Sequence, residues 1–356
     1  MSKHYMGEIV KIDGSYGEGG GQILRTSLAL SIVTGKPLQI YNIRKGRKHP
    51  GLQPQHLTCI LAARDISSAD TEGDRLGSLS LQFIPHEPRS GKYHFNVAEK
   101  RGSAGSTTLV LHTILLPLAM ARNESVVTVE GGTHVPWSPP LHYLSEIFAL
   151  VVAKLGYSFS FGIDRWGWYP RGGGSIHARI FPKKGAHSDL LLESRGNLLE
   201  VSGLSAVSNL PSSIAERQWD EAIRLLHQKG LDAGISILEA PSIGPGTFLF
   251  IKAVFENGVA GFSALGRKGK RAEEVASEAL SEFFEYLETG AVMDPHLADQ
   301  ILLYLAVSGT AHSFTTSRIT QHLLTNAWVI GRFLPNVDIT IDGEAERPGR
   351  VIIQRR

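Results

Sequence analysis

The sequence contains a single cysteine, Cys59, among 356 residues. One cysteine cannot form a disulfide within the chain, and it excludes zinc sites built from several thiolates. The chain also lacks a run of about 18 apolar residues, which is the length that a membrane-spanning helix needs. Residues 1–5 lack the apolar core of a secretory signal. We therefore expect a globular, cytoplasmic protein that contacts no membrane.

Charge is nearly balanced over the whole chain but uneven along it. Lys and Arg number 36 against 34 Asp and Glu, and 42% of the residues are hydrophobic. Between residues 15 and 63 the only carboxylate is Glu18, and it stands against six cations: Arg25, Lys36, Arg44, Lys45, Arg47 and Lys48. Such an excess predicts an acidic partner, although a solvated basic loop would show the same pattern.

A glycine-rich stretch at 16–22 separates a strand-like run from an apolar helical run. Glycine reaches positive φ at little steric cost, so such a loop lets backbone N–H groups converge at a helix N-terminus, where the dipole favours anions. We predict a phosphate site there that includes Gly17, Gly19 and Gly20. A tight turn without a ligand is the alternative, and the stretch has neither the Walker A nor the GxGxxG spacing.

The order of elements predicts an internal repeat. Helices that begin near residues 22, 107 and 297 are separated by about 85 and about 190 residues. Three copies of one β-α-β-α-β-β unit, with about 100 extra residues before the third, explain both separations. We therefore predict an α/β (α+β) fold with repeats 1 and 2 at 1–184, a small inserted α/β domain at 185–271, and repeat 3 at 272–356.

The individual elements are predicted from hydrophobic periodicity and from helix end signals. In the first unit we expect strands at 8–12, 38–41, 78–83 and 93–97 and helices at 22–34 and 55–66. In the second we expect helices at 107–121 and 140–155 and strands at 126–129, 158–162 and 175–181. In the third we expect helices at 297–307 and 322–334 and strands at 313–316, 337–341 and 351–353. The insert should contain strands at 198–203, 235–238 and 247–254, a helix that starts in a capping box from Ser213 to Glu216, and a helix at 272–287.

Two side chains in these elements could carry chemistry. Glu18 lies inside the anion-friendly loop, which favours a cation shared with substrate phosphates, such as Mg²⁺ (or Mn²⁺). His322 lies in the first turn of its helix, where the dipole lowers a histidine pKa and leaves a neutral nucleophile or base. His56 occupies the equivalent position in the first unit, so spacing alone does not choose between the two histidines. The series Lys11-Ile-Asp-Gly14 resembles a lysyl-AMP signature, but the other motifs of those enzymes are not found.

Six stretches resemble RNA 3′-terminal phosphate cyclases over essentially the whole chain. They are Tyr16-Gly-Glu-Gly-Gly-Gly-Gln-Ile-Leu-Arg25, Asn42-Ile-Arg-Lys-Gly-Arg47, Pro50-Gly-Leu-Gln-Pro-Gln-His56, Gly102-Ser-Ala-Gly-Ser106, Gly167-Trp-Tyr-Pro-Arg-Gly-Gly-Gly174 and His322-Leu-Leu-Thr-Asn326. The resemblance implies three repeated units with a small insert. It also implies an enzyme that uses ATP to turn an RNA 3′-phosphate into a 2′,3′-cyclic phosphate through histidyl-AMP and RNA-adenylate intermediates.

The resemblance also assigns roles to single residues. It implies that His322 is the nucleophile that takes AMP and that Glu18 binds the metal ion. Nucleotide contacts are expected from Asp299, Gln300 and Pro139, together with His296 and His112, which stand where bacterial relatives carry Tyr and Gln. Phosphates of the nucleotide or RNA are expected at Arg25, Arg44, Arg47, Gln55 and His56.

Two other functions remain as alternatives. A non-catalytic relative would keep the fold and the basic surface and act as an RNA-binding scaffold in ribosome assembly, but such relatives lack the nucleophilic histidine. An enolpyruvyl transferase would show a similar repeated architecture, and a fold alone does not assign a function. His322 and Glu18 favour the cyclase, with RNA that ends in a 3′-phosphate and ATP as partners and a homodimer as a possible assembly.

Overall fold

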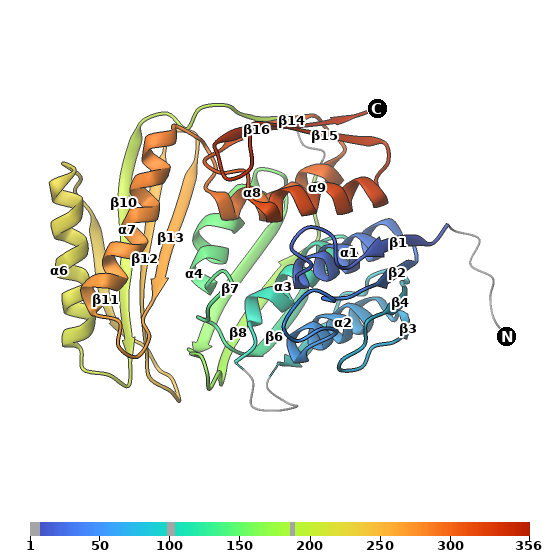
Figure 1. The fold of residues 1–356 in the computed structure, drawn as a ribbon, viewed down its shortest axis with the longest axis horizontal. Coiled ribbons are helices and arrows are strands. Elements are labelled where there is room, and N and C mark those ends of the chain that lie inside the picture. The colour runs from blue at the N-terminus through green and yellow to red at the C-terminus, as the bar shows by residue number, and fades with distance from the viewer. Residues whose placement is uncertain (1–7, 98–103, 186–188) are drawn as a thin grey trace.

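The computed structural model describes residues 8–97, 104–185 and 189–356 (Figure 1). The first unit consists of β1 (Val10–Asp13), α1 (Gly21–Thr34), β2 (Leu38–Tyr41), α2 (Pro54–Ser67), β3 (Asp70–Glu72) and β4 (Leu81–Ile84). Its strands lie in the order β1-β2-β4-β3. The β1 and β2 strands are parallel, and the other two pairs are antiparallel.

The second unit has the same topology. It consists of β5 (Lys92–Asn96), α3 (Thr107–Ala119), β6 (Ser125–Gly131), a helix from residue 141 to 153, β7 (Ser158–Arg165) and β8 (Gly174–Phe181). The helix begins as α4 (Leu141–Tyr143), passes through the π-helical turn η1 (Leu144–Phe148) and ends as α5 (Ala149–Ala153). Pro140 precedes this helix as its N-cap instead of being its first residue as expected.

The third unit is built from two separate parts of the chain. It consists of β9 (Leu190–Leu192), α8 (Pro295–Ser308), β14 (His312–Thr316), α9 (Gln321–Phe333), β15 (Val337–Asp342) and β16 (Gly349–Arg355). Its strand order, β9-β14-β16-β15, matches that of the other two units, again with the first pair parallel. The predicted threefold repeat of a β-α-β-α-β-β unit is therefore confirmed.

Two strands belong to different units than their sequence positions suggested. The strand expected at 93–97 as the end of the first unit is β5, which pairs in parallel with β6 and opens the second sheet. The first strand of the third unit, β9, was not predicted, because its three residues precede the insert by position and are too short to show a period. The insert therefore interrupts the third unit after its first strand.

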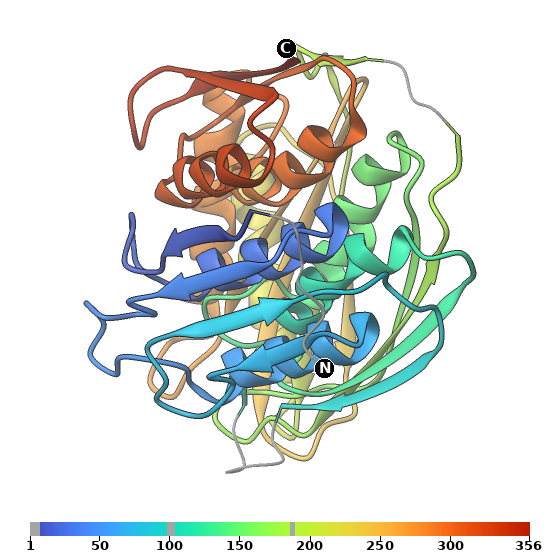
Figure 2. The same cartoon turned by 90° about the vertical axis from the view of Figure 1, so that its right-hand side faces the viewer.

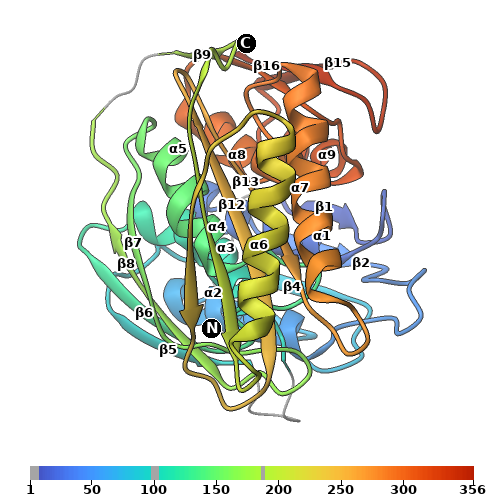
Figure 3. The same ribbon diagram turned by 90° about the vertical axis from the view of Figure 1, so that its left-hand side faces the viewer.

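The inserted unit forms a separate layer at one side of the molecule (Figure 1), and Figure 3 shows this layer facing the viewer. It consists of β10 (Leu198–Ser208), α6 (Ser213–Gln228), β11 (Gly234–Glu239), β12 (Gly246–Phe255), β13 (Val259–Leu265) and α7 (Ala272–Thr289). Both helices pack on the sheet, and α7 contributes Val275, Ala279 and Phe283 to a second hydrophobic core. Because α7 shares this core, we propose that the insert ends near residue 290 and not at 271.

One helix start in the insert differs from the prediction. The capping box expected from Ser213 to Glu216 is absent, because Ser213 is already the first residue of α6 and the preceding Ser212 makes no side-chain cap. Backbone carbonyls close the first turn instead, since Ile214 N donates to Pro211 O at 3.0 Å and Glu216 N donates to Ser212 O at 3.1 Å.

The repeated units share one large core. Buried apolar residues from all three pack into it, and α1 contacts α2, α3 and α9. Figure 2 shows the first unit and the third unit stacked along one side of the molecule. Within the described parts of the chain, no helix combines the length and the apolar character that crossing a membrane requires. The shared core of the three units brings the starts of several helices together.

Candidate active site

Contacts at or near the helix starts connect helices of the three units into one series. Five hydrogen bonds make most of the connections: Gln22 Nε2 to His322 O (3.1 Å), Thr320 Oγ1 to Asp299 Oδ1 (2.5 Å), Tyr143 Oη to Asp294 Oδ1 (2.6 Å), Thr108 Oγ1 to Pro139 O (2.7 Å) and Ser106 N to Gln55 Oε1 (3.0 Å). They join α1 to α9, α9 to α8, α8 to α4, the start of α4 to α3, and α3 to α2. Helix N-termini favour anions, so their grouping marks the candidate site.

His322 is the second residue of α9. Thr320 caps this helix by accepting a hydrogen bond from Leu323 N at 3.0 Å, which fixes the first turn. Desolvation by the surrounding protein lowers the pKa of His322 below its usual value, and the charges of Arg25, His296 and Arg47 lower it further, while Glu18 opposes them. The imidazole is therefore neutral at pH 7, as a nucleophile requires.

Glu18 determines which nitrogen of His322 is free. Its Oε1 lies 3.5 Å from His322 Nδ1, and its Oε2 lies 3.4 Å from an Arg47 guanidinium nitrogen. A carboxylate beside Nδ1 favours the tautomer that carries the proton on that atom, which leaves the lone pair on Nε2. The side chain of His322 is 46% exposed, so a substrate can reach it.

The glycine-rich loop brings Glu18 to α9. Gly17 and Gly19 both have a φ of +57°, and a Cβ at Gly17 would lie 2.5 Å from Thr325 Oγ1 on α9. Tyr16 stacks on Trp328 of the same helix, with ring centroids 4.0 Å apart. Glycine at position 17 is therefore required both by the backbone conformation and by the close approach to α9. Gly20 is the N-cap of α1, as a loop at a helix N-terminus predicts.

Three arginines gather near this loop. Among the described residues, Arg25 has no carboxylate partner, and burial lowers the pKa of its guanidinium. Arg44 donates only to backbone carbonyls, those of His49 at 2.6 Å and Gly51 at 3.2 Å. Arg47 lies beside Glu18, so among the described residues Arg25 and Arg44 are the two of these arginines that are held without acidic partners. Such charges beside helix N-termini form a site for an anion.

His56 is in the first turn of α2, and its ring points to the start of α1. Its Nδ1 accepts a hydrogen bond from Gln53 N at 3.1 Å, and a Cβ placed on Gly21 would lie 2.3 Å from its Nε2. Burial, with Arg25 and Arg44 nearby, lowers its pKa to about 3. The neutral ring therefore carries its proton on Nε2 and has no free lone pair, which argues against His56 as the nucleophile and fits it to donate to an anion.

The residues expected to contact the nucleotide lie on α8, on α3 and just before α4. Asp299 accepts the Thr320 hydroxyl, and its backbone oxygen accepts from Asn326 Nδ2 at 2.8 Å. Burial raises the pKa of its carboxyl group well above the usual value. Asp299 therefore supports the first turn of α9, a contact that sequence reasoning did not predict.

His112 and Gln300 face each other in the interior. The buried His112 Nε2 and Gln300 Oε1 make no well-aligned hydrogen bond among the described residues, although the Gln300 side chain lies within hydrogen-bonding reach of the His112 ring. Burial, followed by the charge of Arg25, lowers the pKa of His112 to about 3, and Gln300 opposes this shift. A hydrogen bond between the two side chains would satisfy both atoms, so this pair does not by itself mark a ligand site.

Two other expected contacts lie at the edges of this region. His296 is the exposed second residue of α8, and its ring meets Tyr143 edge-on at 6.3 Å. The carbonyl of Pro139 is held by Thr108.

Lys11 lies on the exposed face of β1. The neighbouring Asp13 carboxylate accepts from Ser15, so the lysyl-AMP signature has no support here.

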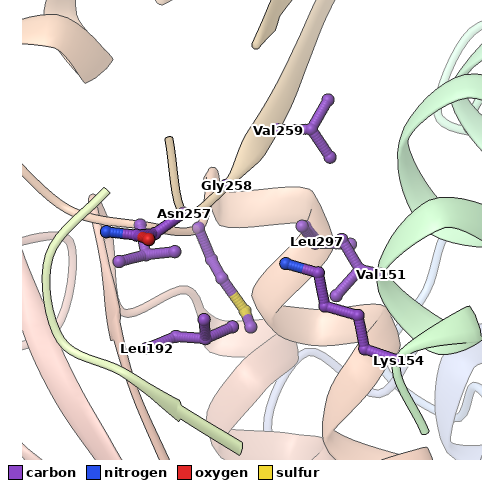
Figure 4. A pocket seen from close by; sticks show the side chains of 9 residues that line it. Val151, Lys154, Leu192, Asn257, Gly258, Val259 and Leu297 are labelled. Atoms are coloured by element: carbon purple, nitrogen blue, oxygen red, sulfur yellow. The ribbon is translucent and has the colours of Figure 1, made fainter. Parts of the chain in front are cut away.

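Two other features are not part of the site. The glycines at 172–174 lead into β8 without opening a helix, and a Cβ at Gly173 would lie 2.2 Å from Ile243 of the insert. Figure 4 shows a cavity of about 10 Å³ between Val151, Leu297 and Val259, which is about the space of one water and too small for a substrate. Gly102 and Ser103 of the second glycine loop lie outside the described residues.

Glu18 is placed to share a metal ion with substrate phosphates. Over residues 8–97, 104–185 and 189–356, no group of three or more His, Cys, Asp or Glu side chains could hold a metal. Glu18 is the carboxylate beside His322 and Arg47. One carboxylate plus substrate phosphates is a usual arrangement for Mg²⁺, so these residues fit such an ion.

Comparison with known proteins identifies the family. The sequence profile described as RNA 3′-terminal phosphate cyclase matches residues 16–341. RNA 3′-terminal phosphate cyclases from Gloeothece citriformis and Pyrococcus abyssi are 43% and 42% identical to this chain. The matches cover 94% and 98% of this chain and 96% and 99% of the two relatives. A third, from Methylococcus capsulatus, is 43% identical over 94% of this chain and 93% of its own length. The chain therefore belongs to the RNA 3′-terminal phosphate cyclase family.

Proposed function

We propose that the chain converts an RNA 3′-terminal phosphate to a 2′,3′-cyclic phosphate at the expense of ATP, with His322 as the nucleophile. The observation that carries this assignment is the pairing of a neutral His322 with Glu18 at 3.5 Å, at the start of α9. A scaffold protein of the same fold has no need of an accessible, neutral histidine beside a carboxylate.

The reaction has three displacements at phosphorus. His322 Nε2 attacks the α-phosphorus of ATP and expels pyrophosphate, which leaves AMP on the histidine. An oxygen of the RNA 3′-phosphate then attacks the same phosphorus and releases His322. Finally the neighbouring 2′-oxygen, after losing its proton, attacks the 3′-phosphorus and expels AMP as the ring closes. Adenylylation is needed because a phosphate monoester lacks a good leaving group.

Electrostatic stabilisation comes from the cations around α1. Arg25, Arg44 and Arg47 hold phosphate oxygens, since their planar donors suit two-point contact with phosphates. His56 adds a neutral Nε2–H donor, and Gln55, held by Ser106 N, borders the same region. The backbone N–H groups at Gly17, Gly19 and Gly20 contribute the anion-binding end of α1.

The nucleotide base lies on the α8 side of the site. His296 and Pro139 enclose the adenine, and Asp299, Gln300 and His112 provide polar contacts to the nucleotide. The closeness of Gln300 to His112 and the family membership of the chain support this placement. Glu18 would hold Mg²⁺ (or Mn²⁺) together with substrate phosphates, and such an ion neutralises charge that develops on the transferred phosphoryl group.

Product analysis tests this function. An RNA oligonucleotide with a labelled 3′-phosphate is incubated with the protein, ATP and Mg²⁺ and then treated with alkaline phosphatase. We expect the label to become resistant to phosphatase, with one AMP released for each end converted, and His322→Ala to leave it sensitive. A label that stays sensitive under every divalent ion would contradict the assignment and favour RNA binding without catalysis.

Two further properties complete the proposal. A cytoplasmic location accords with the single, buried cysteine, because a reducing compartment maintains free thiols. Association as a homodimer stays a prediction, and sedimentation at micromolar concentration tests it.

A further inference from the structure

Trp137 is unusually exposed for its residue type. About 95% of its surface is accessible, which is the largest value among the exposed large apolar side chains of the described chain. Within that part of the chain, no ring, cation or hydrogen-bond partner meets its indole. Tryptophan has more apolar surface to bury than any other side chain, so exposure of both faces leaves a strong contact unmade.

The backbone presents this indole in a fixed position. Trp137 has a φ of +60°, a backbone conformation that residues other than glycine adopt rarely. The loop is held on both sides of it, because Ser138 Oγ donates to Val135 O at 3.0 Å and Pro139 O accepts from Thr108. Prolines at 136, 139 and 140 restrict it further. Strain retained in a rigid loop is typical of functional positions.

The threefold repeat places this loop at the active site. Residues 132–140 connect the second strand of their unit, β6, to its second helix. In the first unit the same connection, 42–53, carries Arg44 and Arg47, and in the third unit, 317–320, it leads to His322. The contacts of Pro139 with α3 and of Tyr143 with Asp294 tie the second loop to the same series of helix starts. Trp137 is therefore the residue by which the second unit occupies the place that Arg44 and Arg47 take in the first unit.

A second exposed aromatic residue lies on the adjoining loop. The N–H groups of Thr133 and His134 both donate to Gly167 O, at 2.9 and 3.2 Å, and this joins residues 132–140 to the loop that carries Tyr169. Tyr169 is 65% exposed. Exposed aromatic faces let proteins stack the bases of single-stranded nucleic acid without reading its sequence.

We propose that Trp137 is a stacking platform for a nucleobase at the 3′ end of the RNA. The proposal rests on the function proposed above. A strand that arrives from solvent with any terminal base suits a face that is open on both sides. The adenine of ATP, in contrast, must be held in register for attack at its α-phosphorus, and His296 with Pro139 is assigned to it. Trp137 thus adds to the proposed site the contact that holds the RNA end.

Steady-state kinetics with two RNAs test this contact. One RNA carries a normal 3′-terminal nucleotide with a 3′-phosphate, and the other carries an abasic 3′-terminal ribose with the same phosphate. We expect Trp137→Leu to raise the KM for the normal RNA by roughly 5- to 100-fold and Trp137→Phe to retain most of the wild-type value, because it keeps an aromatic face. The abasic RNA should give the same KM with all three proteins.

Two control measurements separate the alternatives. Label transfer from ATP without RNA should keep the same rate and the same dependence on ATP in Trp137→Leu. Trp137→Gly should not lower Tm, since glycine accepts a φ of +60°. Leu199 is an exposed apolar residue far from the loop, in the insert, and Leu199→Ala should leave the KM for RNA unchanged.

Four results would overturn the stacking role. They are an unchanged KM for the normal RNA, an equal loss with the abasic RNA, a shift in the ATP dependence of label transfer without a change for RNA, and a fall in Tm for Trp137→Gly. Failure of the proposed function is distinguishable from these, because wild type would then take no label from ATP. Anisotropy of a fluorescent RNA would still compare the variants in that case.

Discussion

At the scale of single residues, the proposed mechanism depends on which histidine is neutral and has a free lone pair. The sequence placed both His56 and His322 in first turns of equivalent helices and did not separate them. The structure separates them by what lies at each Nδ1. Gln53 N, three residues before His56, donates to His56 Nδ1, whereas Glu18, which is distant in sequence, lies beside His322 Nδ1. The Thr320 cap was predictable from local sequence, whereas the support that Asp299 gives to Thr320 was not.

Arg47 should influence the ionisation of His322. Its positive charge is among the causes that lower the pKa of His322, after desolvation and the charges of Arg25 and His296. Arg47→Ala removes one of them, so the pKa of His322 should rise and the acid limb of self-adenylylation should move to higher pH. Titration of the His322 ring by NMR, without nucleotide, measures the shift directly. A fall in the pKa would contradict the arrangement, and a Lys48→Ala variant provides a neighbouring control.

His112 should make the fold sensitive to acid. Its folded pKa is about 3, well below the value of about 6.5 for an unfolded histidine. Between these values the unfolded chain binds a proton that the folded chain does not, so stability falls as pH drops from about 6.5 towards 3. His112→Gln should remove up to about 1.4 kcal/mol per pH unit from that dependence. Urea unfolding at pH 7 and pH 5 tests this, and an identical slope in the variant would refute it.

At the scale of elements, the site is made by helix starts and by the loop before α1. Helices were predicted closely, because their ends carry local signals: α1 was expected at 22–34 and spans Gly21–Thr34, and α9 was expected at 322–334 and spans Gln321–Phe333. Short strands were predicted less well, since β3 and β9 have three residues each and show no period. The π-helical turn η1 has no sequence signal that we recognise.

Gly17 tests how the loop and α9 fit together. Gly17→Ala should cost about 1–2 kcal/mol of stability through its positive φ, and its Cβ should also push against Thr325 and move Glu18 away from His322. Label transfer from ATP should therefore fall by at least about tenfold, for which a loss of about 1.4 kcal/mol suffices. Gly35→Ala is the matched control, because Gly35 also has a positive φ but its Cβ would meet nothing within 4 Å.

The double variant Gly17→Ala with Thr325→Ala separates the two effects. It relieves the contact with α9 but keeps the backbone strain, so label transfer should recover while Tm stays low. If Gly35→Ala impairs label transfer as much as Gly17→Ala does, the loss comes from general destabilisation and the proposed fit is wrong.

At the scale of the whole molecule, three units of one topology surround one site and contribute different side chains to it. The first unit carries arginines, and the third carries His322 with Asp299 and Gln300. The numbers of residues between the helix starts predicted both the repeat and the insert, because these numbers can be read from the sequence without any knowledge of contacts. They did not predict that β9 lies ahead of the insert, since that depends on the pairing of β9 with the distant β14. The helix at 272–287 was expected in the insert and packs there as α7, beyond the predicted boundary at 271. The fold on its own does not assign a reaction, which is why the test of function concerns His322.

Covalent labelling tests the central claim most directly. The protein is incubated with α-labelled ATP and Mg²⁺ in the absence of RNA and separated on a denaturing gel, together with His322→Ala, His56→Ala and Lys11→Ala. Wild type and Lys11→Ala should retain label, His56→Ala should retain it at a reduced rate, and His322→Ala should take none. Label on His322→Ala, or loss of label only in His56→Ala or Lys11→Ala, would contradict the assignment of His322 as the nucleophile.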